Sequence, residues 1–191
     1  MRRRTRSAAT LPWTWGSVEG AEVPDGLVDD APRRRAARSV ASDADPRVLY
    51  LWLCQLRRAP YSYDWIDNVG RRSPRRADPT LTALAVGQRF MTIFSLVDVV
   101  PDRSLTLTMR PGAPTWIFGA ITVRYAIVPR GDGDALLRGD LWMPAGGGPA
   151  ARLRRYLLAW GDLLMMSKQL RTLRALAERD SSAPAPPAAR P

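Results

Sequence analysis

The chain has 191 residues, of which 46% are hydrophobic and 25% are charged, a composition that suits one well-buried domain with flanking tails. Its formal net charge is +11, and nearly all the positive charge is arginine, because Lys168 is the only lysine. The absence of histidine and the single cysteine, Cys54, exclude Ser-His-Asp and Cys-His catalysis, structural zinc sites and an internal disulfide. We therefore expect no metal site and no cofactor.

The arginines gather in short runs, at residues 2–6, 33–35, 71–76 and 152–155. Such runs suit a solvated surface, and they also suit contact with nucleic acid or an anionic membrane. No helix-turn-helix, zinc-finger or RNP pattern accompanies them. The sequence favours a solvated surface, and polyanion binding through the arginine-rich N-terminal arm stays open as an alternative.

Composition divides the chain into three parts. Residues 1–35 mix charges, prolines and glycines without a period, which predicts an irregular basic arm whose two tryptophans in "LPWTWG" dock on the body. Residues 180–191 are rich in Pro and Ala and are predicted to be disordered. Residues 36–179 remain as the folded domain. No apolar run has the length of a signal peptide or a membrane span, so a soluble, cytoplasmic protein is expected.

A first helix is predicted to begin in "DADPRVLYLWLCQLRR" and to end before Pro60. Asp45 suits the N-cap and Pro46 suits the first helical position. Apolar residues then recur at helical spacing, at Val48, Leu49, Trp52, Leu53 and Leu56. Cys54 lies inside this helix and is expected to be a small buried hydrophobic residue.

The middle of the chain changes to a period of two. Residues 88–100 alternate and predict one long strand, residues 101–103 make a tight turn, and residues 104–110 resume the alternation. The segments 116–129 and 135–144 are predicted as the next two strands. The sequence therefore predicts a meander of antiparallel strands.

The last predicted element is a helix over residues 149–179, with Pro149 in its first turn. About 30 residues at roughly 1.5 Å each make it about 45 Å long, enough to cross a sheet. It carries a single predicted apolar stripe, formed by Leu153, Tyr156, Leu157, Trp160, Leu163, Leu164, Ser167, Leu170, Leu173 and Leu176. This stripe requires a large partner surface.

Early helices, a meander and one long amphipathic helix are the order of an α+β fold in which a curved sheet wraps a terminal helix. Over residues 36–179 the chain resembles the START/Bet v 1-like superfamily, also called SRPBCC, polyketide cyclase/dehydrase and lipid-transport proteins. The resemblance lies in "RSVASDADPRVLYLWLCQL", in the hairpins "VGQRFMTIFSLVDVVPDRSLTLTMR" and "ITVRYAIVP…ALLRGDLWMP", and in the closing helix.

The resemblance implies a helix-grip fold, with a curved antiparallel sheet wrapped around a long C-terminal helix and two short helices after the first strand. Sheet and helices of that superfamily enclose an apolar cavity in which members bind or transform lipids, sterols, plant metabolites and polyketides. "PYSYDWIDN", at residues 60–68, would hold the second short helix, which plugs one end of the cavity.

The expected ligand is therefore a lipid, polyketide or aromatic metabolite, bound or transported between the sheet and the last helix. Large side chains of these elements are predicted to line the cavity, or instead to fill it as ordinary core. They are Tyr61, Tyr63, Trp65, Phe90, Phe94, Trp116, Tyr125, Trp142, Trp160, Leu164 and Met165.

An enzyme of the polyketide cyclase, aromatase or dehydratase type is the alternative. Without histidine, its acid and base would be tyrosine or aspartate, and the candidates are Tyr61, Tyr63 and Asp64. Asp64 and Asp67 would share a face of a helical turn, although Asp67 is explained more simply as the end of that helix.

Two charged residues of the strand over 135–144 raise a further question. Arg138 and Asp140 share one strand face with Trp142, and a charged residue inside the cavity would be costly unless it were paired. Alternation alone does not decide which side of the sheet this face is.

Overall fold

The computed structural model describes residues 10–17, 33–63, 70–131 and 134–182. In chain order its elements are β1 (Thr14–Trp15), β2 (Arg33–Ser42), α1 (Pro46–Cys54), the 3-10 helices η1 (Gln55–Arg57) and η2 (Pro79–Thr82), β3 (Arg89–Phe90), β4 (Phe94–Val100), β5 (Ser104–Met109), α3 (Ala113–Phe118), β6 (Thr122–Pro129), β7 (Ala135–Pro144) and α4 (Pro149–Ser181).

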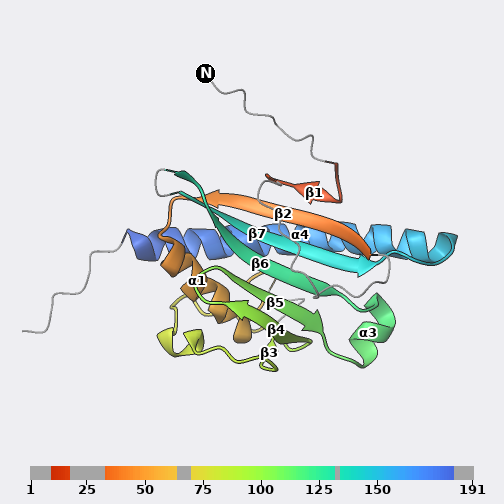
Figure 1. Cartoon of the computed structure of the whole chain (residues 1–191), viewed down its shortest axis with the longest axis horizontal. Helices are drawn as coiled ribbons and strands as arrows, with labels where there is room; N and C mark the ends of the chain where they lie inside the picture. Colours follow the sequence, from red (N-terminus) through yellow and green to blue (C-terminus); the bar gives the residue numbers. More distant parts are fainter. Residues whose placement is uncertain (1–9, 18–32, 64–69, 132–133, 183–191) are drawn as a thin grey trace, which may run out of the picture.

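The described strands form one seven-stranded sheet in the order β1-β2-β7-β6-β5-β4-β3. Neighbours are antiparallel except at one edge, where β1 runs parallel to β2. The long helix α4 crosses one face of the sheet along β2 and β7, and α1 packs beside its C-terminal half (Figure 1). This is the predicted α+β helix-grip architecture, so the fold class is confirmed.

The register of β7 separates the two faces of the sheet. A Cβ atom placed on Gly139 would lie 2.6 Å from Sδ of Met166 in α4, so Gly139 faces the helix and lets it approach closely. Because side chains alternate along a strand, Leu137 and Leu141 also face α4. Arg138 and Asp140 therefore point to the opposite face.

The start of α1 confirms the capping prediction. The carboxylate of Asp45 accepts a hydrogen bond of 2.7 Å from the backbone N–H of Arg47, and Pro46 occupies the first helical position. Cys54 is fully buried, as expected, and burial raises the pKa of its thiol to about 12. This thiol is therefore protonated at neutral pH and unsuited to nucleophilic chemistry.

The prediction of one strand over residues 88–100 is wrong. The chain forms a short hairpin there, in which β3 and β4 pair with Phe90 opposite Phe94. Met91 and Thr92 between them have φ angles of 43° and 67°, which reverse the chain direction. Neither residue type is typical of a positive φ angle, so the sequence carries no sign of this turn.

The first part of the segment over residues 116–129 is also not a strand. Residues Ala113–Phe118 form α3, which begins after Gly112 and ends at Gly119, where φ is 84°. The strand β6 starts only at Thr122. Trp116 consequently lies on a short surface helix, with 85% of its surface exposed.

The single apolar stripe predicted for α4 is wrong as well. Leu163, Leu170 and Leu173 are buried against the sheet and α1, whereas Leu157 and Leu164 are exposed. The prediction therefore assigned residues from two different faces of α4 to one stripe, because apolar residues occur on both sides of the first half of the helix. Only one side can contact the sheet.

The tryptophans of "LPWTWG" pack against the body, as expected. Trp13 and Trp15 are partly buried against the core, and the carbonyl of Trp13 accepts a hydrogen bond of 2.8 Å from the N–H of Ala37 in β2. The short helix predicted within residues 60–68 is absent from residues 60–63, and the rest of that stretch lies outside the described residues. The predicted start of the disordered tail at residue 180 is wrong, because α4 continues to Ser181, and the residues after 182 lie outside the described part of the chain. Of the described helices, none has the length and apolar character needed to cross a bilayer.

Candidate ligand-binding site

A buried glutamine joins α4, β6 and the chain that follows α1. Gln169 of α4 is 4% exposed, and its Oε1 accepts a hydrogen bond of 2.6 Å from the hydroxyl of Tyr125 in β6. Its Nε2 donates to the carbonyl of Pro60 at 2.5 Å and to Sδ of Met91 at 3.4 Å. Burial raises the pKa of Tyr125, so this hydroxyl stays protonated as a donor. Gln169 thus holds the backbone next to Tyr61 in place.

Tyr61 forms the floor of a groove of about 260 Å³ beside α4. Its side chain is 1% exposed, and its φ angle of 55° is uncommon for a tyrosine. The ring lies edge-on to Trp52 of α1, with 5.8 Å between the ring centroids and 86° between the planes. Helix α1 therefore supports the groove from below.

The walls of the groove are polar and positively charged. One wall comes from α4, where residues one helical turn apart share a face, and the other from the chain around Ser62 and Ser73. The walls are lined by Ser62, Ser73, Arg75, Lys168, Arg171, Thr172 and Ala175.

The cations that line the groove have no carboxylate partner among the described residues. Neither Lys168 nor Arg75 forms a side-chain ion pair with any described residue, and Arg75 is exposed. Arg171 differs only in its aromatic contact, because its guanidinium carbon stacks 4.9 Å from the ring centroid of Trp15. A groove lined by several cations and hydroxyl groups over a buried aromatic residue is suited to an anion attached to an apolar group.

A second polar pair lies under the middle of α4. Arg38 of β2 is fully buried, and its Nη2 lies 3.1 Å from Oδ2 of Asp162 and donates to the carbonyl of Ala159 at 3.2 Å. Its Nη1 donates to the carbonyl of Trp13 at 2.9 Å. Burial raises the pKa of Asp162 to about 6, although the adjacent guanidinium acts in the opposite direction. The ion pair of Arg38 with Asp162 therefore links β2 to α4, and the hydrogen bond to Trp13 adds the chain next to β1.

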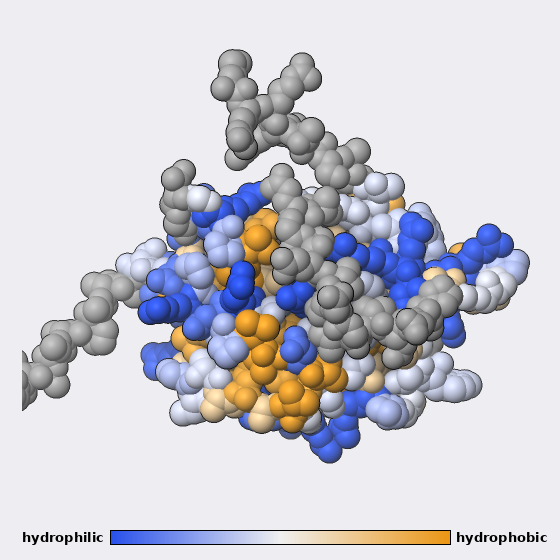
Figure 2. All heavy atoms as spheres, viewed as in Figure 1, coloured by the Kyte–Doolittle hydropathy of each residue, from blue (hydrophilic) through white to orange (hydrophobic). Residues whose placement is uncertain are grey.

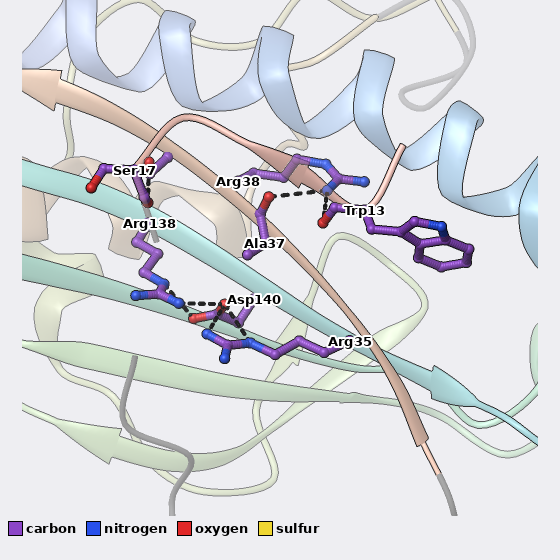
Figure 3. A network of polar contacts seen from close by, with 8 residues as sticks. Trp13, Ser17, Arg35, Ala37, Arg38, Arg138 and Asp140 are labelled. Atoms are coloured by element: carbon purple, nitrogen blue, oxygen red, sulfur yellow. Dashed lines mark hydrogen bonds and ion pairs between the residues drawn. The ribbon is translucent and has the colours of Figure 1, made fainter. Parts of the chain in front are cut away.

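The charged residues of β7 belong to the face turned away from α4. Arg35 of β2 and Arg138 both bind Asp140, at 2.7 Å in each ion pair (Figure 3). Figure 2 views this side of the molecule, where hydrophobic residues gather over β4 and β5 and hydrophilic residues surround them. Trp142 shares this face and lies beneath Arg35, 5.9 Å from its guanidinium carbon. It is therefore on the opposite side of the sheet from the groove.

The structure brings only some of the predicted ligand residues together. Phe90 and Tyr125 are buried in the core between sheet and helices, and Phe94 is half-buried beside them. Tyr61 lies in the groove, and Tyr63 is half-buried two positions later.

The other predicted residues lie elsewhere. Trp160 and Leu164 are exposed on α4, at 37% and 57%, Met165 is half-buried next to them, and Trp116 is exposed on α3. Asp64 and Trp65 fall outside the described residues. The binding role of these side chains and the catalytic role of Tyr61, Tyr63 and Asp64 remain predictions.

Sequence reasoning missed Lys168, Arg75 and Gln169. Lys168 and Arg75 are polar residues in surface segments far apart along the chain, and no local pattern joins them. One sequence signal did exist, since Lys168 is the only lysine in a chain whose other basic residues are all arginine. Gln169 interrupts the buried side of α4, which marks it as a polar group that needs partners.

No family model matches the chain, and no curated protein matches it. Among solved structures, it is similar to a protein of Mesorhizobium loti, with 17% identity and a TM-score of 0.49 over 76% of this chain and 98% of that one. The chain is also similar to the ZhuI aromatase/cyclase of a Streptomyces species, with 13% identity and a TM-score of 0.49 over 80% of this chain and 98% of that one. A third similar structure is a norcoclaurine synthase point mutant of Thalictrum flavum, with 11% identity and a TM-score of 0.46 over 80% of this chain and 98% of that one. At these identities the likeness is one of fold alone.

Replacing Gln169 with leucine should lower the free energy of unfolding by about 1–3 kcal/mol, because it leaves the buried Tyr125 hydroxyl and the Pro60 carbonyl without this partner. Urea denaturation measures the change. The double variant Gln169→Leu, Tyr125→Phe should recover part of the loss, since one orphaned hydroxyl is then removed. A single variant as stable as the parent protein would contradict the role of Gln169.

Proposed function

We propose that this protein binds a hydrophobic small molecule that carries an anionic group, in the groove between α4 and the chain around Tyr61 and Ser73. The observation that supports the proposal is the pair of cations, Lys168 and Arg75, without carboxylate partners among the described residues, above a buried aromatic floor. A lipid-like, polyketide-like or aromatic carboxylate has this combination of charge and apolar surface.

The groove gives each part of such a ligand a distinct environment. The anionic group would lie between Lys168 and Arg75, where charge-assisted hydrogen bonds are stronger than neutral ones. The apolar part would pack on Ala175 and on the aliphatic stems of the basic side chains, above the buried ring of Tyr61. A volume of about 260 Å³ suits a headgroup with a ring system or a short chain.

The rigidity of the floor also favours binding. Tyr61 is supported from below by Trp52 and from the side by the hydrogen bond between Gln169 and Pro60. A floor held in place before the ligand arrives loses little conformational freedom on binding. The ligand therefore meets a largely preformed site.

A matched pair of fluorescent probes tests the proposal. Anilinonaphthalene sulfonate has an aromatic body with a negative charge, and phenylnaphthylamine has the same body without the charge. The full-length protein should bind the sulfonate more tightly. The variant Lys168→Glu should weaken that binding by about tenfold or more and leave phenylnaphthylamine binding nearly unchanged, since the lost interaction is ionic.

Arg47→Glu is the matched control. Arg47 is an exposed cation at the start of α1, outside the groove, and this variant changes the net charge as much as Lys168→Glu does. It should bind the sulfonate as the parent protein does. Equal affinity for the two probes, or equal weakening in both variants, would overturn the proposal.

A further inference from the structure

The first half of α4 carries a row of apolar side chains on its outer surface. These side chains are Leu153, Tyr156, Leu157, Trp160 and Leu164, with 60%, 45%, 61%, 37% and 57% of their surface exposed. Their spacing of three and four places them on one face of the helix. We call this face the outer stripe.

The outer stripe is separate from the core. The residues of α4 that contact the sheet, among them Ala159 and Met166, lie on another side of the helix and are nearly fully buried. A surface helix ordinarily presents charged or polar side chains outward. A contiguous exposed apolar face of this kind marks an interaction site.

Positive charge borders the outer stripe. Arg152 and Arg154 are exposed in the first two turns of α4, next to Leu153. Between residues 149 and 168 the only acidic residue is Asp162, which pairs with the buried Arg38 at 3.1 Å and is 18% exposed. The partner of the stripe must therefore accept apolar side chains and also supply negative charge.

We propose that the outer stripe docks α4 on the surface of a lipid bilayer that contains anionic lipids. A helix with leucines and aromatic residues on one side and arginines beside them lies in the interface plane, with its apolar side among the acyl chains. Tyr156 and Trp160 pack edge to face, at 6.4 Å between centroids and 80° between planes. Aromatic side chains of these types concentrate at the level of the lipid headgroups.

Helix α3 lies at the same end of the molecule as the start of α4. Phe118 at its end lines a small pocket together with Arg154 of α4, so the two helices adjoin at this end of the molecule (Figure 1). Trp116 of α3 exposes 85% of its surface.

Charge argues against a second copy of this chain as the partner. A parallel pair of outer stripes would place Arg152 and Arg154 against their own copies. An antiparallel pair would bring Arg152 within about one turn of Lys168. Neither arrangement supplies a carboxylate from the described part of α4 near the stripe, so like charges would meet. An anionic bilayer satisfies both the apolar side chains and the arginines.

The outer stripe leads towards the groove. Leu164, Lys168 and Arg171 follow one another at spacings of four and three, so they share one face of α4. Docking would hold the mouth of the groove beside the membrane surface. The docking itself does not depend on what the groove binds.

Co-sedimentation of the full-length protein with lipid vesicles tests the docking. The protein should bind vesicles of phosphatidylcholine mixed with phosphatidylglycerol, and it should bind vesicles of pure phosphatidylcholine much more weakly. The double variant Leu153→Ser, Leu157→Ser should lower the affinity for the mixed vesicles by about tenfold or more, because two leucines that would enter the bilayer are lost at unchanged charge. Arg152→Gln, Arg154→Gln should weaken binding to the mixed vesicles only.

The control is Val86→Ser, which removes an apolar side chain that is 66% exposed and lies outside α4. It should bind as the parent protein does. The leucine double variant should keep its affinity for anilinonaphthalene sulfonate, which separates a failure of docking from a failure of the groove.

Three results would overturn the docking proposal. The first is no binding of the parent protein to either kind of vesicle. The second is unchanged binding of the leucine double variant, which would assign binding to another basic segment. The third is a dimer, seen by light scattering, that the leucine double variant abolishes.

Discussion

Replacing Arg38 with methionine should lower the free energy of unfolding at pH 8 by about 3–5 kcal/mol. Arg38 is fully buried and joins three parts of the molecule, through the carbonyl of Trp13, the carbonyl of Ala159 and the carboxylate of Asp162. Methionine fills a similar volume but leaves Asp162 largely buried without its cation. Chemical denaturation monitored by tryptophan fluorescence measures the change.

The loss of unfolding free energy in the Arg38→Met variant should be smaller at pH 5 than at pH 8. Burial raises the pKa of Asp162 to about 6, against about 4 in an unfolded chain. Between these values the folded state binds more protons, so the contribution of Asp162 to the free energy of unfolding decreases as the pH rises from about 4 to about 6. Removing Arg38 raises the pKa of Asp162 further, so protonation at pH 5 relieves the unpaired charge. Water reaches part of this carboxylate, which is 18% exposed, and limits the effect.

The double variant Arg38→Met, Asp162→Leu is the control for this pair. Replacing both charged partners with apolar side chains leaves neither charge alone, so most of the stability should return. The difference between pH 5 and pH 8 seen in the single variant should also disappear. A single variant equally unstable at both pH values would show that the lost hydrogen bonds, and not the charge of Asp162, cause the effect.

Replacing Trp52 with alanine should lower the free energy of unfolding by about 3–5 kcal/mol and also weaken ligand binding. Trp52 is fully buried, its Nε1 donates to Oδ2 of Asp180 at 3.0 Å, and its ring supports Tyr61 edge-on. Alanine leaves a cavity beneath the floor of the groove, so Tyr61 loses a rigid neighbour. Denaturation and titration with anilinonaphthalene sulfonate measure the two effects.

Trp52→Phe separates the two roles of this side chain. Phenylalanine keeps a ring next to Tyr61 but cannot donate to Asp180, so its stability should fall less and its probe affinity should stay close to that of the parent protein. If Trp52→Ala bound the probe as tightly as the parent protein, the groove would not depend on the support of Tyr61.

Local sequence signals predicted those elements that depend on nearby residues. Asp45 and Pro46 marked the start of α1 because a cap involves only the first helical turn. Alternation predicted β5 and β7 because strand residues on one face repeat every second position. The hairpin at Met91 and Thr92 was not predicted, since these residue types seldom adopt the positive φ angles found there.

The candidate site was predictable only in part. Tyr61 was among the predicted ligand residues and does line the groove, but Lys168 and Arg75 were not. Helical periodicity showed that α4 is amphipathic, yet it did not show which of its two apolar faces contacts the sheet. That choice depends on the contacts of Met166 with Gly139 and of Asp162 with Arg38.

The sequence by itself determined the start of α1, the strands β5 and β7 and the absence of histidine chemistry, because these follow from short-range capping, periodicity and composition. The helix-grip class was expected from the family resemblance. Only the tertiary structure decided that Arg138 and Asp140 face away from α4, that Gln169 links Tyr125 to Pro60, and which cations meet above Tyr61. These relations join segments distant along the chain. Packing of the whole sheet against α4 sets them, and no local pattern encodes that packing.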